Sequence, residues 1–203
     1  PALSDNMAKI TLEAVKAAKD NGLTVSCDLN FRKKLWTSEK ACAVMSDVLK
    51  HVDVCIANEE DAKDVFGIEA ENTDVESGKL NEEGYVSVAK QLTDRFGFKA
   101  VAITLRESLS ASDNNWSGML YVANRAFFGK KYHMHIVDRV GGGDSFGAGL
   151  IYALTNDFGA QDAIEFAVAA SCLKHSVEGD YNMVSKEEVL NLARGNASGR
   201  VQR

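Results

Sequence analysis

The strongest constraint on the fold is an alternation of short apolar runs with segments of helical periodicity. The apolar runs, which have the length of buried strands, span residues 23–29, 52–57 and 100–104. The segments with apolar residues at helical spacing run from about residues 4–20, 38–50 and 82–96. Strands that alternate with helices predict an α/β fold with a parallel sheet covered on both faces.

The second half of the chain predicts one antiparallel element and three more helices. Residues 119–122 and 127–137 are predicted strands joined through Asn124-Arg125. The helices are expected after a glycine-rich stretch to about residue 155, over residues 160–175, and after a capping box at Ser185. The polar stretches at residues 69–84 and 108–117 are predicted loops, and residues 195–203 a disordered tail.

Charge and composition exclude some function classes. The net charge of −6 provides no basic field for nucleic acid or an anionic membrane. No apolar run approaches the ~20 residues of a membrane span. The four cysteines are scattered, which favours buried thiols in the reducing cytoplasm. On the partly exposed strand face, His133 and His135 have no third ligand in view, so a metal site there is not expected.

The glycine-rich stretch from Val137 to Gly149 lies between a predicted strand and a predicted helix. Backbone N–H groups of Gly141, Gly142 and Gly143, added to the positive end of the helix, make a site for an anion such as phosphate. Asp144 can accept the proton of an alcohol that attacks a phosphoryl group. The alternative is that Asp144 only caps its own helix.

Polar residues follow the first two strands, where ligands gather in α/β sheets. Arg32 can pair with a substrate carboxylate through two hydrogen bonds, or it can form a surface ion pair. Asn58 and Asp61 share a helix face, where they can hold water on a magnesium ion. Glu59 and Glu60 are nearby substitutes for Asp61, and the alternative for Asn58 is a helix N-cap.

Three stretches together resemble a known family. Asp138 to Asp144 is similar to the signature Asp-Thr-x-Gly-Ala-Gly-Asp of the ribokinase-like (pfkB-type) carbohydrate kinases, with Arg139 for the threonine and Gly142 for the alanine. The other stretches, which resemble the 2-keto-3-deoxygluconate kinases of that family, are Asp28-Leu29-Asn30-Phe31-Arg32 with Leu35-Trp36, and Leu173-Lys174-His175-Ser176 with Gly179-Asp180.

The resemblance implies a ribokinase-like three-layer fold and a kinase activity. Residues 1–194 would be the C-terminal portion of a single kinase domain, with the family's N-terminal strands and lid outside the chain. The activity implied is transfer of the ATP γ-phosphoryl group to a sugar-acid hydroxyl, best guessed as 2-keto-3-deoxygluconate, with Asp144 as the base. Dimers of this family often form through the lid, and several relatives hold a monovalent cation near the glycine loop, so a homo-oligomer and such a cation are open expectations.

The resemblance also assigns residues to ligands. It places Asn30, Asn58, Thr104 and Arg106 near ATP, where the family commonly has glycine in place of Arg106. It places Arg32 and Asp180 near the sugar, and Asn58 with Asp61 or Glu59 near Mg²⁺ through water. The family has glutamate in place of Asp61. Two alternatives stay open: a kinase for a neutral sugar (fructose or ribose) or a nucleoside, and a nucleotide-binding fragment without catalysis.

Overall fold

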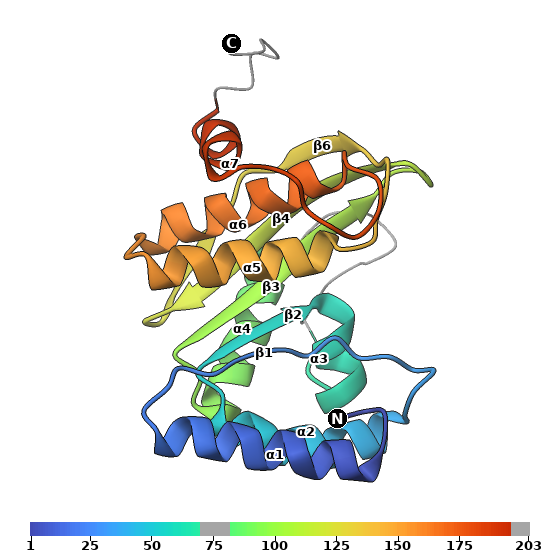
Figure 1. Cartoon of the computed structure of the whole chain (residues 1–203), viewed down its shortest axis with the longest axis vertical. Coiled ribbons are helices and arrows are strands. Elements are labelled where there is room, and N and C mark those ends of the chain that lie inside the picture. Colours follow the sequence, from blue (N-terminus) through green and yellow to red (C-terminus); the bar gives the residue numbers. More distant parts are fainter. Residues whose placement is uncertain (70–81, 196–203) are drawn as a thin grey trace. The chain divides into compact units, whose positions relative to one another are not determined.

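The computed structural model describes residues 1–69 and 82–195, which form two compact units (Figure 1). The first unit comprises residues 1–104 and 120–126, and the second comprises residues 105–119 and the chain from residue 127 onward. The strand order is β1-β2-β3-β4-β5, and β6 pairs with β4. Strands β3 (Ala100–Ser108), β4 (Asp113–Val122) and β5 (Arg125–Phe128) each contribute residues to both units.

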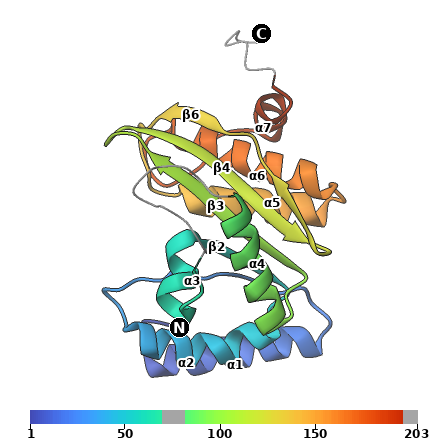
Figure 2. The ribbon, with the colours of Figure 1, turned by 180° about the vertical axis from the view of Figure 1, so that it is seen from behind.

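In the first unit, three parallel strands alternate with helices as predicted. Its further elements are α1 (Asp5–Asp20), β1 (Ser26–Asp28), α2 (Ser38–Val48), the 3₁₀ turn η1 (Leu49–His51), β2 (Val54–Asn58), α3 (Glu59–Phe66) and α4 (Glu82–Phe96). In the parallel register, Cys27 pairs with Cys55, and Cys55 pairs with Val101. Strand β1 is shorter than the predicted 23–29 because Leu23 is exposed and lies outside the ladder. Helices α1 and α2 lie side by side (Figures 1 and 2).

A buried carboxylate ties the start of this sheet together. Asp53 is 5% exposed and binds the ammonium groups of Lys19 and Lys99 at 2.7 and 3.0 Å. It also accepts the Val25 N–H at 2.9 Å. Burial raises the pKa of Asp53, but these hydrogen bonds outweigh the effect and lower the pKa to about 2.

The second unit is built around a pair of antiparallel strands and two packed helices. Its further elements are β6 (Tyr132–His135), α5 (Gly142–Thr155), α6 (Ala160–Lys174) and α7 (Lys186–Ala193). Helices α5 and α6 lie side by side in both views (Figures 1 and 2). A Cβ on Gly149 would lie 3.1 Å from Ala167 Cα and from Ala170 Cβ, which explains a glycine inside α5.

The prediction of a loop over residues 108–117 is wrong. Strand β3 continues to Ser108, and β4 begins at Asp113, where residues 113–116 pair with β6 in antiparallel register. Asn114 and Trp116 are buried, whereas Asp113 and Asn115 are less buried, so residues 113–116 have the two-residue alternation of a strand. The predicted strand 127–137 is divided into β5 and β6.

The remaining predictions are mostly confirmed within the described residues. The turn between β4 and β5 is formed by Ala123 and Asn124, both in the left-handed region, one residue earlier than the predicted Asn124-Arg125, because Arg125 already begins β5. The capping box at Ser185 is present at the start of α7. Residues 196–203 of the tail expected at 195–203, and most of the loop expected at 69–84, lie outside the described residues. Helix α4 begins at Glu82, within that expected loop. No helix in the described ranges is long and apolar enough to cross a membrane.

Candidate functional site

The first unit gathers predicted ligand-binding residues at the carboxyl ends of its parallel strands. Asn58 is the last residue of β2 and pairs directly with Thr104 on β3. Strand β1 ends at Asp28, two residues before Asn30, whose φ of 40° turns the chain out of the strand. The edge where ligands bind in α/β sheets therefore carries Asn30, Asn58 and Thr104 within this unit.

Asn58 and Asp61 form a capping box at the start of α3. The Asp61 N–H donates to Asn58 Oδ1 at 2.8 Å, and the Asn58 N–H donates to Asp61 Oδ2 at 3.4 Å. Asp61 Oδ1 also accepts the Phe31 N–H at 3.0 Å, which holds the segment after β1 against α3. The capping alternative is thus observed, and the side chain of the third proposed ligand, Glu59, lies outside what the structure describes.

Asp61 is the buried charge of this cluster. Asp61 is 4% exposed. Burial raises the pKa of its carboxyl, although the N–H groups of Phe31 and Asn58 bind the charged form and act to lower it. The nearby Arg32 guanidinium acts in the opposite direction to burial. A cation close to this carboxyl would therefore favour its ionised form.

Arg32 lies on a pocket of about 370 Å³ in the first unit. The pocket is lined by Phe31, Arg32, Lys33, Lys34, Asn58, Glu60, Asp61 and Asp64. Arg32 is exposed, and its Nη1 donates to the Phe31 carbonyl at 3.1 Å. Among the described residues it forms no ion pair, whereas Lys33 binds Asp64 at 3.0 Å. The guanidinium of Arg32 is therefore available to a carboxylate from outside.

The second unit contains the glycine loop, which we define as residues 138–144. Gly141 has a φ of +79° and is the N-cap of α5, with no side chain capping the helix. The Gly142 N–H donates to the Arg139 carbonyl at 3.3 Å. Within the described ranges, the N–H groups of Gly141 and Gly143 make no hydrogen bond.

Asp144 lies in the first turn of α5, and its side chain is exposed. No hydrogen bond or ion pair to this carboxylate occurs in the described part of the chain, so the alternative that it caps its own helix is not observed. The loop therefore presents two backbone donors and one carboxylate next to each other, which are the groups that phosphoryl transfer from an alcohol requires.

The glycine loop is held by the chain that follows α6. The carboxylate of Asp138 accepts the Val140 N–H at 3.0 Å and the Gly179 N–H at 2.9 Å, and these bonds lower the pKa of Asp138. A Cβ on Gly141 would overlap the backbone carbonyl oxygen of Asp180, so this stretch packs directly on the loop. The side chain of Asp180, predicted to bind the sugar, is exposed.

Two buried polar residues of α6 and its end support the loop and were not predicted to do so. The Ser171 hydroxyl donates to the Gly142 carbonyl at 2.7 Å, and His175 Nδ1 lies 2.7 Å from the Ser171 carbonyl. Both residues are buried. Their spacing of four places them on one helix face, and polar residues on an otherwise apolar face were the signal available in the sequence.

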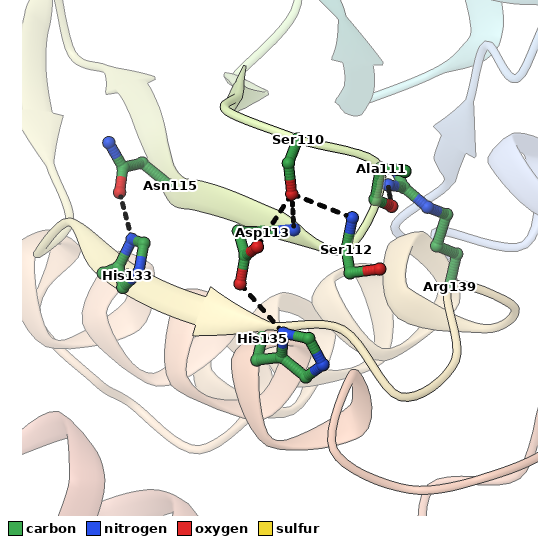
Figure 3. A network of polar contacts seen from close by, with 8 residues as sticks. All are labelled: Ser110, Ala111, Ser112, Asp113, Asn115, His133, His135 and Arg139. Atoms are coloured by element: carbon green, nitrogen blue, oxygen red, sulfur yellow. Dashed lines mark hydrogen bonds and ion pairs between the residues drawn. The ribbon is translucent and has the colours of Figure 1, made fainter.

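Arg139 has a partner that its sequence context did not indicate. Its Nη2 donates to the Ala111 carbonyl at 2.6 Å, in the turn between β3 and β4 (Figure 3). In the same network, Ser110 binds Asp113 and Asp113 binds His135 at 2.9 Å, while His133 binds Asn115 (Figure 3). The two histidines thus belong to a polar strand face. No group of three or more His, Cys, Asp and Glu residues that could hold a metal occurs among the described residues.

Arg106 is exposed on β3. The neighbouring Glu107 carboxylate binds Lys131 and Asn115, each at 2.7 Å. These contacts occupy the acidic residue next to Arg106. The predicted residues thus fall into two sets, with Asn30, Arg32, Asn58, Asp61 and Thr104 in the first unit and Arg106, the glycine loop and Asp180 in the second.

Comparison with known proteins finds similarity to carbohydrate kinases along nearly the whole chain. The crystal structure of a 2-dehydro-3-deoxygluconokinase from Thermotoga maritima is 47% identical, with a TM-score of 0.90 over 96% of this chain and 57% of that chain. A 2-dehydro-3-deoxygalactonokinase of Haloferax volcanii is 27% identical over 98% of this chain and 56% of its own length. The chain therefore spans little more than half the length of these relatives.

A more distant structure shares the fold. A ribokinase II from E. coli, solved in complex with ATP and Mg²⁺, is 21% identical, with a TM-score of 0.72 over 96% of this chain and 56% of that chain. These similarities confirm the predicted ribokinase-like fold. The model of the pfkB family carbohydrate kinases matches residues 2–187, and the chain belongs to this family.

Proposed function

We propose that the protein carrying this chain transfers the γ-phosphoryl group of ATP to a hydroxyl of a sugar acid. The start of α5 carries this proposal, because the N–H groups of Gly141 and Gly143 and the exposed carboxylate of Asp144 lie together without partners in the described ranges. Family membership and the 47% identity to a 2-dehydro-3-deoxygluconokinase support it.

The proposed reaction needs a base and hydrogen-bond donors that stabilise negative charge on the phosphoryl group. The hydroxyl oxygen attacks the γ-phosphorus, its proton passes to Asp144, and the bond from the γ-phosphorus to the bridging oxygen breaks to leave ADP. The N–H groups of Gly141 and Gly143 stabilise charge on the transferred group. Gly142 joins them when its long 3.3 Å bond to the Arg139 carbonyl opens.

ATP and Mg²⁺ are assigned to the strand ends. We propose that Asn30, Asn58 and Thr104, with Arg106 on β3, lie along the nucleotide phosphates. The side-chain oxygens of Asn58 and Asp61 each accept one backbone N–H, and their remaining lone pairs can accept hydrogen bonds from the water of a hydrated Mg²⁺. Glu59 is the third proposed contact. Bound there, Mg²⁺ would neutralise phosphate charge.

The acceptor we propose is 2-keto-3-deoxygluconate, which becomes its 6-phosphate. Arg32 supports a sugar acid, because its guanidinium is exposed on a pocket and lacks an ion pair among the described residues. Asp180 is the second proposed substrate contact, through the stretch that packs on Gly141. We further propose that the enzyme is cytoplasmic and that its partners are ATP and the sugar acid. Self-association of the full-length protein is a separate question for experiment.

The test is ADP formation by the full-length protein with ATP and Mg²⁺, comparing 2-keto-3-deoxygluconate with gluconate, fructose and ribose. We expect selective turnover of the keto-deoxy acid. Turnover of a neutral sugar alone would retain the Asp144 mechanism and overturn the assigned substrate. ATP binding without any turnover would favour a nucleotide-binding module. Repeating the assay with and without K⁺ tests the predicted monovalent cation.

A further inference from the structure

His175 is a buried histidine that the proposed mechanism does not use. Its residue is 5% exposed, and it follows directly after α6. Its carbonyl accepts the N–H groups of Val137 and Asp138 at 2.9 and 3.3 Å, so its backbone binds the entry to the glycine loop. Its ring lies against the Trp116 indole, with 5.2 Å between the ring centroids.

The imidazole also contacts the middle of the loop. A Cβ on Gly142 would overlap the ring and lie 2.7 Å from Nε2, so the ring fills the space beside the Gly142 backbone. Ser171 completes the contact, because its carbonyl faces Nδ1 and its hydroxyl binds the Gly142 carbonyl. One ring thus limits the position of the peptide between the two proposed donors, Gly141 and Gly143.

We propose that His175 is a positioning residue, whose ring holds the backbone of Gly142 where the loop can stabilise the transferred phosphoryl group. This inference rests on the proposed function, and it assigns His175 no contact with substrate. A 1 Å displacement of such donors is enough to cost on the order of 100-fold in rate, which is why a ring behind the loop matters.

The surroundings of the ring favour its neutral form. A carbonyl oxygen only accepts hydrogen bonds, so the ring proton belongs on Nδ1, opposite Ser171. Burial lowers the pKa of His175, and the charges of Lys174 on α6, Arg139 in the loop and Arg106 on β3 add to this effect, while the bond to Ser171 opposes it. A second proton would place a positive charge on the ring beside the Gly142 backbone and near Arg139, Lys174 and Arg106. Acid should therefore disturb the loop through His175.

The first experiment uses pH. His175→Gln keeps an amide donor for the Ser171 carbonyl but cannot titrate in this range. We expect its kcat at pH 7.5 to fall, because glutamine does not replace the ring beside Gly142, and the fraction of that kcat retained at pH 5 to exceed the fraction that the wild-type protein retains. His133→Gln, on the exposed face of β6, is the control and should keep the wild-type profile.

The second experiment needs no turnover. Gly142→Ala should lower the melting temperature because the new methyl group overlaps the ring, and His175→Ala should lower it because it leaves a cavity. The double variant should melt well above the value expected from adding the two single changes. Two results would overturn the proposal. One is a double variant whose shift in melting temperature equals the sum of the two single shifts. The other is a His175→Gln variant that loses the same fraction of its kcat between pH 7.5 and pH 5 as the wild-type protein. Non-additive melting temperatures in a protein that phosphorylates no sugar would refute the proposed function and the positioning role of His175 in it, while leaving the packing of His175 on Gly142 intact.

Discussion

Gly141→Ala and Gly143→Ala form a matched pair that tests the geometry of the glycine loop. Gly141 has a φ of +79°, and a Cβ there would overlap the Asp180 carbonyl oxygen. Gly143 has nothing within 4 Å of such a Cβ. The added methyl group therefore overlaps a backbone carbonyl in Gly141→Ala and lies in open space in Gly143→Ala.

The expected destabilisation follows from two terms. Alanine in the left-handed region costs roughly 1–2 kcal/mol. Moving a backbone carbonyl by on the order of 1 Å adds about 1–3 kcal/mol, as overpacking does elsewhere. We therefore expect Gly141→Ala to lose about 2–5 kcal/mol of unfolding free energy, whereas Gly143→Ala should be neutral or gain up to about 1 kcal/mol from helix propensity.

Urea denaturation of the full-length wild-type protein and the two variants measures this difference. The fluorescence of Trp116 reports on the second unit, because Trp116 is buried there beside His175. Equal midpoints for the two variants would refute the loop geometry, and a Gly143→Ala variant less stable than Gly141→Ala would do so more strongly.

Two further changes test charges in the first unit. Asp53→Asn should cost about 2 kcal/mol at pH 7, since a pKa lowered from 3.8 to about 2 stabilises the folded state above pH 4 and this contribution is lost as the pH falls toward 2. Urea titrations at pH 7, 5 and 3 measure the unfolding free energy. The control is Asp94→Asn, at an exposed position, which should change the unfolding free energy by less than about 1 kcal/mol. An equally small effect of Asp53→Asn would contradict the stabilising role assigned to the Asp53 carboxylate. Arg32→Ala should raise KM for a sugar acid at least about tenfold and leave KM for ATP within about threefold, with partial rescue by Arg32→Lys. In steady-state assays, equal losses for acidic and neutral sugars would contradict a carboxylate contact.

The sequence predicts well those features that depend on local pattern. The helix caps at Asn58 and Ser185 follow from residues within a few positions of each other. The strand over residues 113–116 was mispredicted as loop because its polar composition outweighed its two-residue alternation, which became visible only through pairing with β6.

Contacts between distant residues account for what the sequence could not predict. The bond from the Phe31 N–H to Asp61 joins residues 30 positions apart. The contact between Gly142 and the His175 ring likewise depends on the packing of α5 on α6. Periodicity indicates which face of a helix is buried, but it does not indicate which residue of another helix meets it.

The most direct test of the central claim is the rate of ADP formation by Asp144→Asn in the full-length protein, with ATP, Mg²⁺ and 2-keto-3-deoxygluconate. The matched control is Asp162→Asn, which removes an exposed acid from the first turn of α6. We predict that Asp144→Asn lowers kcat by at least about 1,000-fold with ATP affinity unchanged within a few-fold, and that the control keeps wild-type turnover. Turnover by Asp144→Asn near the wild-type rate would contradict the assignment of Asp144 as the base.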